Sequence, residues 1–251
     1  MQESAIVSRH RRIAISKELA AMRDIGSMIE KLNRVAGYYR DRIEVAGYTL
    51  RHSTDFEALE AATRKNGDML TPHFSTAENT FVRREAFWVG VWEGDICIAT
   101  LACKFQALGC ETLAQYSRRY WQRSYARGST EQIVFSAQQK RYMESLKGNL
   151  VYCGEYRVSP DYQKSGIGGL LAGYTKPAIF LLWPETDFIY IYMEDKDVRR
   201  GLLPAIGLST QIQNALNWDT APSQAKADYW LAGIAALEFE DWLDDELRVD
   251  G

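Results

Sequence analysis

The chain has 251 residues, of which 46% are hydrophobic and 25% charged, and its formal net charge is −3. This composition is ordinary for a soluble globular protein, and the small negative charge gives no overall attraction to nucleic acid or a membrane surface. The four cysteines form no C-x-x-C pair and the three histidines lie far apart, so we expect free thiols and no metal site. Without a signal-like segment or an apolar run of about 18 residues, a cytoplasmic protein is expected.

The first half of the chain alternates helical and extended patterns. Its predicted elements are, in chain order, one long or two shorter helices over Ser8–Arg40, a strand over Gly47–His52, a helix from Ser53 to Asn66, a loop over Asp68–Thr80, and strands over Phe87–Trp92 and Ile96–Phe105. Gly26 and Gly37 interrupt the first helical pattern, and Ser53 is placed to cap the second helix. The last two strands predict a hairpin, because Gly94 between them supplies the positive φ that a tight turn needs.

The second half predicts a helical stretch followed by a β-α-β-α-β-β series. Its elements are two helices within Leu108–Gly148 that separate near Gly128, a strand over Leu150–Val158, a helix over Gly166–Trp183, a strand over Asp187–Met193, a short helix over Asp197–Ile206, strands over Ser209–Asn217 and Tyr229–Ala235, and an acidic closing helix. Strands that alternate with helices in this order predict an α/β or α+β fold around a mixed sheet.

The most informative segment is a glycine-rich turn that joins a predicted strand to a predicted helix. It contains Gln163, Gly166, Gly168 and Gly169. Glycines at a helix start leave backbone N–H groups bare at the positive end of the helix dipole, so the turn predicts a phosphate or pyrophosphate site. The dinucleotide-binding pattern G-x-G-x-x-G is excluded because Leu171 stands where its third glycine would be. Close packing of the strand against the helix is the alternative explanation.

The pattern V-S-P-x-Y followed by Q-x-x-G-I-G-G-L-L resembles motif A of the GNAT superfamily of N-acyltransferases. The resemblance covers about 87–105 and 150–206, and implies that two strands splay apart to admit the pantetheine arm of acetyl-CoA or another acyl-CoA. It also implies which residues hold this cosubstrate. They are Tyr156 and Val158, through backbone groups beside the arm, and Gln163, Lys164, Gly166, Ile167, Gly168 and Gly169, around the pyrophosphate.

The acid and the base of the transfer are less clear from the resemblance. Many members place a tyrosine on the helix after the fifth strand to protonate the leaving thiolate, and the matching stretch here has none. We therefore take Tyr192 as the candidate acid, with packing as the alternative explanation. Glu155 is the candidate base or ammonium anchor, and an ion pair with Arg157 is its alternative role. Glu194 and Asp195 are weaker candidates.

Arginines four residues apart give the predicted helical insertion a basic stripe. They are Arg119, Arg123 and Arg127, with tyrosines and a tryptophan between them. Interleaved arginines and aromatics occur on nucleic-acid-binding surfaces. The favoured explanation is an amphipathic helix that covers the sheet with its arginines in water. A third explanation is that the insertion forms a lid over an acceptor site.

The resemblance implies a mixed, mostly antiparallel sheet with a splayed cofactor cleft, flanked by helices. The GNAT-like acyltransferase domain spans residues 46–251, with an N-terminal helical extension over 1–45 and a helical insertion over 108–148. The implied reaction is direct transfer of an acetyl or other acyl group from a CoA thioester to a primary amine in a ternary complex, without a metal.

The expected acceptor is a small-molecule or peptide amine. Nucleic acid is a disfavoured partner, and a homodimer is left open. Two other functions compete with this one. The first is a long-chain N-acyltransferase whose donor is an acyl carrier protein, and the second is a non-catalytic acyl-CoA-binding module.

Overall fold

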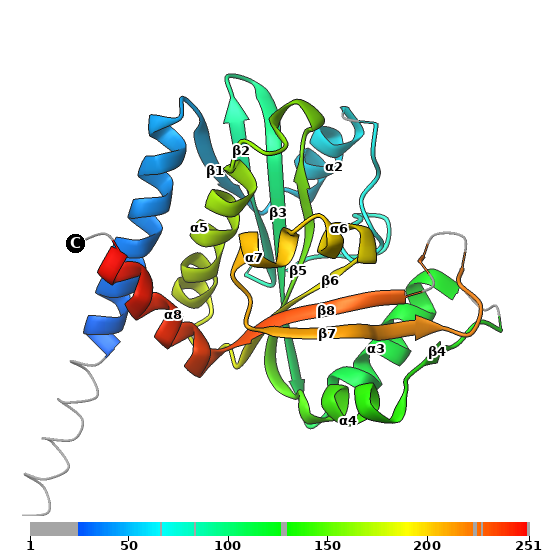
Figure 1. Cartoon of the computed structure of the whole chain (residues 1–251). Coiled ribbons are helices and arrows are strands. Elements are labelled where there is room, and N and C mark those ends of the chain that lie inside the picture. The colour runs from blue at the N-terminus through cyan, green and yellow to red at the C-terminus, as the bar shows by residue number, and fades with distance from the viewer. Residues whose placement is uncertain are drawn as a thin grey trace, which may run out of the picture.

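The computed structural model describes residues 25–65, 67–82, 84–126, 130–222, 225–226 and 228–249 (Figure 1). One eight-stranded sheet runs through it, in the order β1-β2-β3-β5-β6-β8-β7-β4. The strands are β1 (Thr49–Ser53), β2 (Ala86–Glu93), β3 (Ile96–Gly109), β4 (Ile133–Val134), β5 (Gly148–Val158), β6 (Phe188–Met193), β7 (Thr210–Trp218) and β8 (Asp228–Ala235). Within the described residues β5 and β6 form the one parallel pair, so the sheet is mixed and mostly antiparallel, as predicted.

Helices cover both faces of this sheet. They are a helix over 25–45, α2 (Phe56–Lys65), α3 (Leu113–Trp121) with a π-helix over Gln122–Ala126, α4 (Ala137–Ser145), a 3-10 turn over Pro160–Tyr162, α5 (Ile167–Leu182), α6 (Asp195–Arg199), α7 (Leu202–Ile206) and α8 (Ala236–Val249). One face packs against α5, α8 and the helix over 25–45, and the opposite face packs against α2 and α3 (Figure 1). None of the helices in the described part of the chain is long and apolar enough to cross a membrane.

The alternating side chains of β2 explain the two apolar cores. Phe87, Val89 and Val91 belong to the core under α5, whereas Trp88 belongs to the core under α2. Burial on both faces therefore makes this strand almost continuously apolar. The predicted hairpin is confirmed, since β2 and β3 meet in a two-residue turn in which Gly94 has φ +58°.

Three local predictions need correction. The described part of the first helix runs unbroken from 25 to 45, so neither Gly26 nor Gly37 interrupts it, and the earlier residues of that prediction lie outside the described residues. The cap of α2 is Asp55, whose Oδ1 accepts from the Ala58 N–H at 3.0 Å, because Ser53 is still paired in β1. The single helix predicted over 197–206 is two, α6 and α7, separated at Gly201 with φ +85°.

The helical insertion covers the sheet as an amphipathic surface. Its aromatic side chains Tyr116, Tyr120 and Trp121 are buried, whereas Arg119 is exposed and pairs with Glu111 at 2.8 Å. The favoured explanation of the basic stripe is therefore confirmed for its described part; Arg127 lies outside the described residues. The insertion also adds β4, which the sequence analysis missed, to the edge of the sheet beside β7.

The helix over 25–45 docks against α5 and α8. Gly173 of α5 admits the Tyr39 ring, because a Cβ at that glycine would lie 2.3 Å from the ring. The Tyr39 hydroxyl donates to Glu246 at 2.7 Å, and Lys31 pairs with Asp244 at 2.6 Å. The acidic closing helix thus supplies partners for the N-terminal one.

Lys176 ties three helices of this face together. From α5 its Nζ donates to the carbonyls of Ile206 at 3.0 Å and Gly207 at 3.3 Å, and it lies 3.7 Å from the ring centroid of Trp242 in α8. Burial lowers the pKa of Lys176 from its usual 10.5 to about 7, and the Glu246 carboxylate acts in the opposite direction. Above about pH 7 the folded chain therefore holds this side chain as a neutral amine.

We predict that Lys176→Met changes how stability depends on pH. Between about pH 7 and 10.5 the unfolded chain keeps a proton on Lys176 that the folded chain has lost, so the free energy of unfolding rises with pH there. The slope from this group approaches ~1.4 kcal/mol per pH unit. Urea unfolding at about pH 7, 8 and 9 gives the free energy of unfolding of the native chain and of Lys176→Met. The difference between the two, followed against pH, measures this slope. A difference that stays constant with pH would show that Lys176 remains charged in the fold.

Candidate functional site

A bulge in β5 distinguishes the centre of the sheet. Ala102 of β3 pairs with Gly154, and Thr100 pairs with Arg157, so Glu155 and Tyr156 both oppose one residue of β3. Glu155 has φ +48°, in the left-handed region that is rare for residues other than glycine. The Thr100 hydroxyl donates to the Glu155 carbonyl at 2.8 Å and holds this conformation. An extra residue of this kind bends a strand and interrupts its ladder.

Beyond the bulge β5 and β6 separate. Their parallel pairing extends from Leu150–Phe188 to Cys153–Ile191 and no further. β5 continues beside β3 to Val158, whereas β6 follows β8 to the pair Met193–Trp230. The splay expected from the resemblance is therefore present, between β5 and β6.

A cleft of about 510 Å³ opens at this splay. It is walled by β5, β6, α6, the loop before β2, the end of α3 and β8. Its aromatic residues are Trp121, Tyr125, Tyr152, Tyr156, Tyr192 and Tyr229. Its charged residues are Asp68, Glu155, Arg157, Glu194, Lys196, Asp197 and Arg200. The site is therefore an aromatic cleft with charges of both signs.

The glycine-rich turn lies at the start of α5, beside the end of β5. Gly166 is the N-cap residue with φ +84°, and the Ser165 hydroxyl accepts from the Ile167 N–H at 3.3 Å. As the second and third residues of the helix, Gly168 and Gly169 have no earlier helical carbonyl to bond, so their N–H groups are available to an anion. The helix is 16 residues long, which gives its N-terminus the positive end of a substantial dipole.

Packing leaves little room for a side chain at two of these glycines. A Cβ at Gly168 would lie 2.6 Å from the Tyr156 hydroxyl and 3.2 Å from Val158, and one at Gly169 would lie 3.3 Å from the Ala205 carbonyl of α7. The close strand–helix packing that the sequence analysis gave as the alternative explanation of these glycines is therefore present, and so are the unpaired N–H groups. Binding of a pyrophosphate at this turn stays a prediction. Its predicted residues are Gln163, Lys164, Gly166, Ile167, Gly168 and Gly169.

Glu155 is enclosed at the floor of the cleft. One carboxylate oxygen accepts from the Thr71 N–H at 2.8 Å and the Thr71 hydroxyl at 2.6 Å. The other accepts from Arg157 at 2.8 and 3.1 Å, and Arg157 also pairs with Asp68 at 2.8 Å. The ion pair suggested as the alternative role of Glu155 therefore exists, and its side chain is fully buried. These bonds join the bulge to the loop before β2.

The other catalytic candidates lie in different surroundings. Tyr192 lines the cleft, and its hydroxyl lies 3.2 Å from the Ser117 hydroxyl. Burial raises the pKa of Tyr192 and keeps it protonated. Glu194 also lines the cleft and pairs with Lys196 at 2.9 Å. Asp195 is not among the lining residues, since it pairs with Arg199 and accepts from Trp230.

The sequence analysis missed several residues of the cleft. Asp197 of α6 lines it, and burial raises the pKa of its carboxyl, while nearby Lys196 acts in the opposite direction. Trp121 and Tyr125 come from the insertion, and Tyr229 comes from β8. The four-residue spacing of Trp121 and Tyr125 was a visible signal of a shared face, and their place in the cleft agrees with the lid that the sequence analysis gave as an alternative for the insertion.

Searches with known proteins give only remote likenesses. No family model and no curated protein matches the chain. A solved structure of Arabidopsis thaliana NAA60 in complex with a bisubstrate analogue is 13% identical, covers 74% of this chain and 99% of its own, and has a TM-score of 0.42. FeeM, an N-acyl amino acid synthase from uncultured soil microbes, is 15% identical, with coverages of 77% and 93% and a TM-score of 0.44.

The ribosomal-protein-S18-alanine N-acetyltransferase from Escherichia coli is 10% identical, covers 75% of this chain and 93% of its own, and has a TM-score of 0.40. Such values transfer neither an activity nor a residue role to this chain. The relevant observations are its own splay and its own glycine turn. Both agree with the GNAT resemblance.

We predict that the methyl group in Gly168→Ala destabilises the fold through Tyr156. The Cβ would lie 2.6 Å from the Tyr156 hydroxyl, and overpacking of this kind costs about 1–3 kcal/mol. In a Tyr156→Phe background the same change should cost less than about 1 kcal/mol, because the clashing oxygen is gone. Urea unfolding of the four proteins in this double-mutant cycle measures the coupling. An equal cost in both backgrounds would show that Tyr156 does not select glycine at 168.

Proposed function

We propose that this chain is a GNAT-type N-acyltransferase, which transfers an acyl group from a CoA thioester to a primary amine in a ternary complex. The observation that carries the proposal is the gap between β5 and β6 beyond Cys153 and Ile191, with the glycine turn of α5 packed against β5 beside it. The gap has the position of a missing strand, and the turn offers N–H groups to an anion.

The backbone of β5 supports this placement of the donor. On the edge that faces β6, β5 has no β6 partner after Cys153, so Tyr156 and Val158 present peptide groups to the gap. An exposed strand edge pairs readily with an extended chain, and the amides of a pantetheine arm can pair with it in the way an added strand does. With the arm in this gap, the pyrophosphate reaches the N–H groups of Gly168 and Gly169.

We predict that CoA and acetyl-CoA raise the melting temperature by mass action on the folded state, and that NAD does so much less. Ser165→Asp should abolish most of the CoA effect, because its carboxylate repels the pyrophosphate. The same substitution should leave the free protein equally stable or more stable, since a negative charge at the N-terminus of α5 is favourable.

Ser165→Asn is the neutral control and should keep the CoA shift. Stabilisation by NAD and not by CoA would overturn the donor assignment. A CoA shift that Ser165→Asp leaves intact would place the pyrophosphate away from the turn.

The acceptor side of the proposal rests on the charges in the cleft. A primary amine enters as an ammonium ion, and the carboxylates of Asp197 and Glu194 line its path. The transfer forms an N–C bond and breaks the C–S bond of the thioester. The amine loses a proton and the departing thiolate gains one, so the site needs a proton acceptor and a proton donor.

We assign the role of proton acceptor to Asp197, because its raised pKa suits a base. Both carboxylate oxygens of Glu155 already accept hydrogen bonds, so Glu155 suits this role less well. Glu155 then acts as a positioning residue that holds Thr71 and Arg157 under the cleft. Tyr192 is the proposed proton donor, since it is protonated and lines the cleft.

We predict that Asp197→Asn lowers kcat by about 10²-fold or more with an amine panel and acetyl-CoA, and removes the low-pH limb of the rate profile. Acetyl-CoA affinity should change little. Tyr192→Phe in the same assay tests the donor. Glu155→Gln should instead lower stability by roughly 3–5 kcal/mol, because it breaks a buried pair.

A selective loss of kcat in a stable Glu155→Gln protein, with Asp197→Asn fully active, would reverse the two roles. Binding of acetyl-CoA without turnover of any amine would favour the non-catalytic module.

A further inference from the structure

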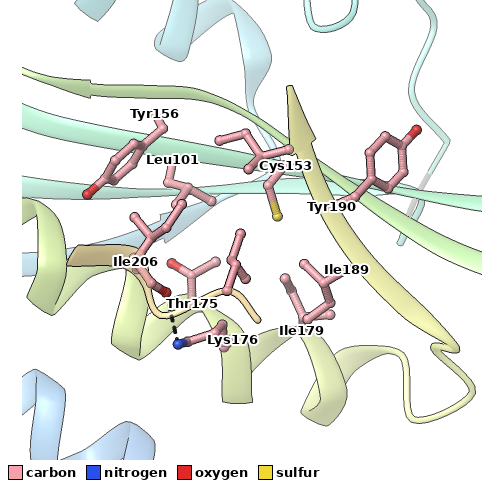
Figure 2. A pocket seen from close by; sticks show the side chains of 12 residues that line it. Leu101, Cys153, Tyr156, Thr175, Lys176, Ile179, Ile189, Tyr190 and Ile206 are labelled. Atoms are coloured by element: carbon pink, nitrogen blue, oxygen red, sulfur yellow. Dashed lines mark hydrogen bonds between the residues drawn. The ribbon is translucent and has the colours of Figure 1, made fainter. Parts of the chain in front are cut away.

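A small cavity lies behind the splay, between β5, β6 and α5 (Figure 2). Its volume is about 30 Å³, and its walls are mainly aliphatic. The lining includes Leu101, Cys153, Ile179, Ile189, Ile191 and Ile206. Two polar side chains in the wall have backbone partners, since Thr175 donates to the Leu171 carbonyl and Lys176 to that of Ile206. The lining of the cavity is therefore largely apolar.

The cavity adjoins the cleft at the point where the strands separate. Tyr156 and Ile191 line both spaces, and Cys153–Ile191 is the last pair between β5 and β6. Figure 2 shows Cys153 and Tyr156 from β5 beside the cavity, with Ile179 and Thr175 on α5 facing them. A group that extends past the end of the gap therefore meets this cavity on the α5 side of the sheet.

We infer that this cavity is the subsite for the acyl chain, and that it selects a short saturated chain of about four carbons over acetyl. The inference rests on the proposed function. A thioester at the end of the gap faces the closed pairing of β5 and β6, so its acyl chain must leave toward one face of the sheet. The polar face, with Glu155 and Tyr192, belongs to the acceptor cleft, and the α5 face offers the apolar cavity.

The size of the cavity sets the chain length. A cavity of about 10–15 Å³ holds one water-sized group, so about 30 Å³ admits roughly two methylene-sized groups beyond an acetyl carbon pair. Apolar cavities of this kind stay dry and accept apolar guests. Ile179 and Ile189, which are 0% and 2% exposed, form buried parts of the wall, so a longer chain would have to displace core side chains.

The test measures binding of free CoA, acetyl-CoA, butyryl-CoA and octanoyl-CoA by calorimetry to the native chain. Two further buried methylenes should tighten butyryl-CoA about 15-fold relative to acetyl-CoA, because each contributes about fourfold. Octanoyl-CoA should bind at least several-fold more weakly than butyryl-CoA. Equal affinity for acetyl-CoA and butyryl-CoA, with free CoA bound, would overturn the subsite and leave the proposed function standing.

A matched pair of α5 variants locates the effect. Ala172 lines the cavity, and Ala172→Leu should remove the butyryl preference while acetyl-CoA affinity stays within about threefold. Ala178 lies on the same helix outside the cavity, so Ala178→Leu should keep the preference. Circular dichroism confirms that both variants are folded. A preference that survives in Ala172→Leu overturns the location, and failure of every thioester and of CoA to bind overturns the proposed function itself.

A second variant, Ile179→Val, removes one methyl group from the wall of the cavity. It should move the optimum toward pentanoyl-CoA, and an unchanged optimum in this variant would contradict the assignment of Ile179 as the limit on chain length.

Discussion

The bulge at Glu155 is the constraint from which the site is built. A residue other than glycine with positive φ costs about 1–3 kcal/mol, and it persists only where its surroundings hold it. Here the Thr100 hydroxyl binds its carbonyl, and Thr71 and Arg157 together bind its carboxylate. Glu155 is thus held from both ends. Without the bulge, β5 would continue beside β6 and close the gap that the proposed donor needs.

The two faces of the sheet give this gap two different surroundings. On one face the loop before β2 and the insertion bring polar and aromatic side chains to the cleft. On the other face α5 lies in an apolar core, and Lys176 and the helix over 25–45 fix its position from behind. The segments that lie outside the resemblance therefore help to form the cleft and to place the helix whose N-terminus faces the gap.

Much of the fold could be predicted because its signals are local. The helical pattern from Ser53 to Asn66 predicted α2, and Gly94 predicted the hairpin. The two-residue strand β4 could not be predicted, since it is too short to show a period and depends on pairing with β7. Gly201 was a visible signal for the break between α6 and α7, and the sequence analysis passed over it.

The site was predictable mainly where motif segments form it, and Tyr192 and Glu194, at the end of the following strand, were also candidates that line the cleft. The glycine turn and the end of β5 are adjacent in sequence, so a motif described both. The bulge left no such signal, because it lies at a glutamate whose φ is set by contacts with Thr71 and Thr100 from distant strands and loops. Asp197 and Tyr229 join the cleft through the tertiary fold alone, which places β6 and β8 side by side.

Tyr156 shows how closely the parts of the site depend on one another. Its side chain packs on Gly168 at the start of α5, lines the cleft, and forms part of the wall of the apolar cavity. The bulge aims it there, because Gly154 and Glu155 both face the polar side and return Tyr156 to the α5 side. A shift of the bulge by one residue would turn this ring to the other face. The backbone irregularity of β5 therefore determines the shape of the cleft, the cavity and the glycine turn together.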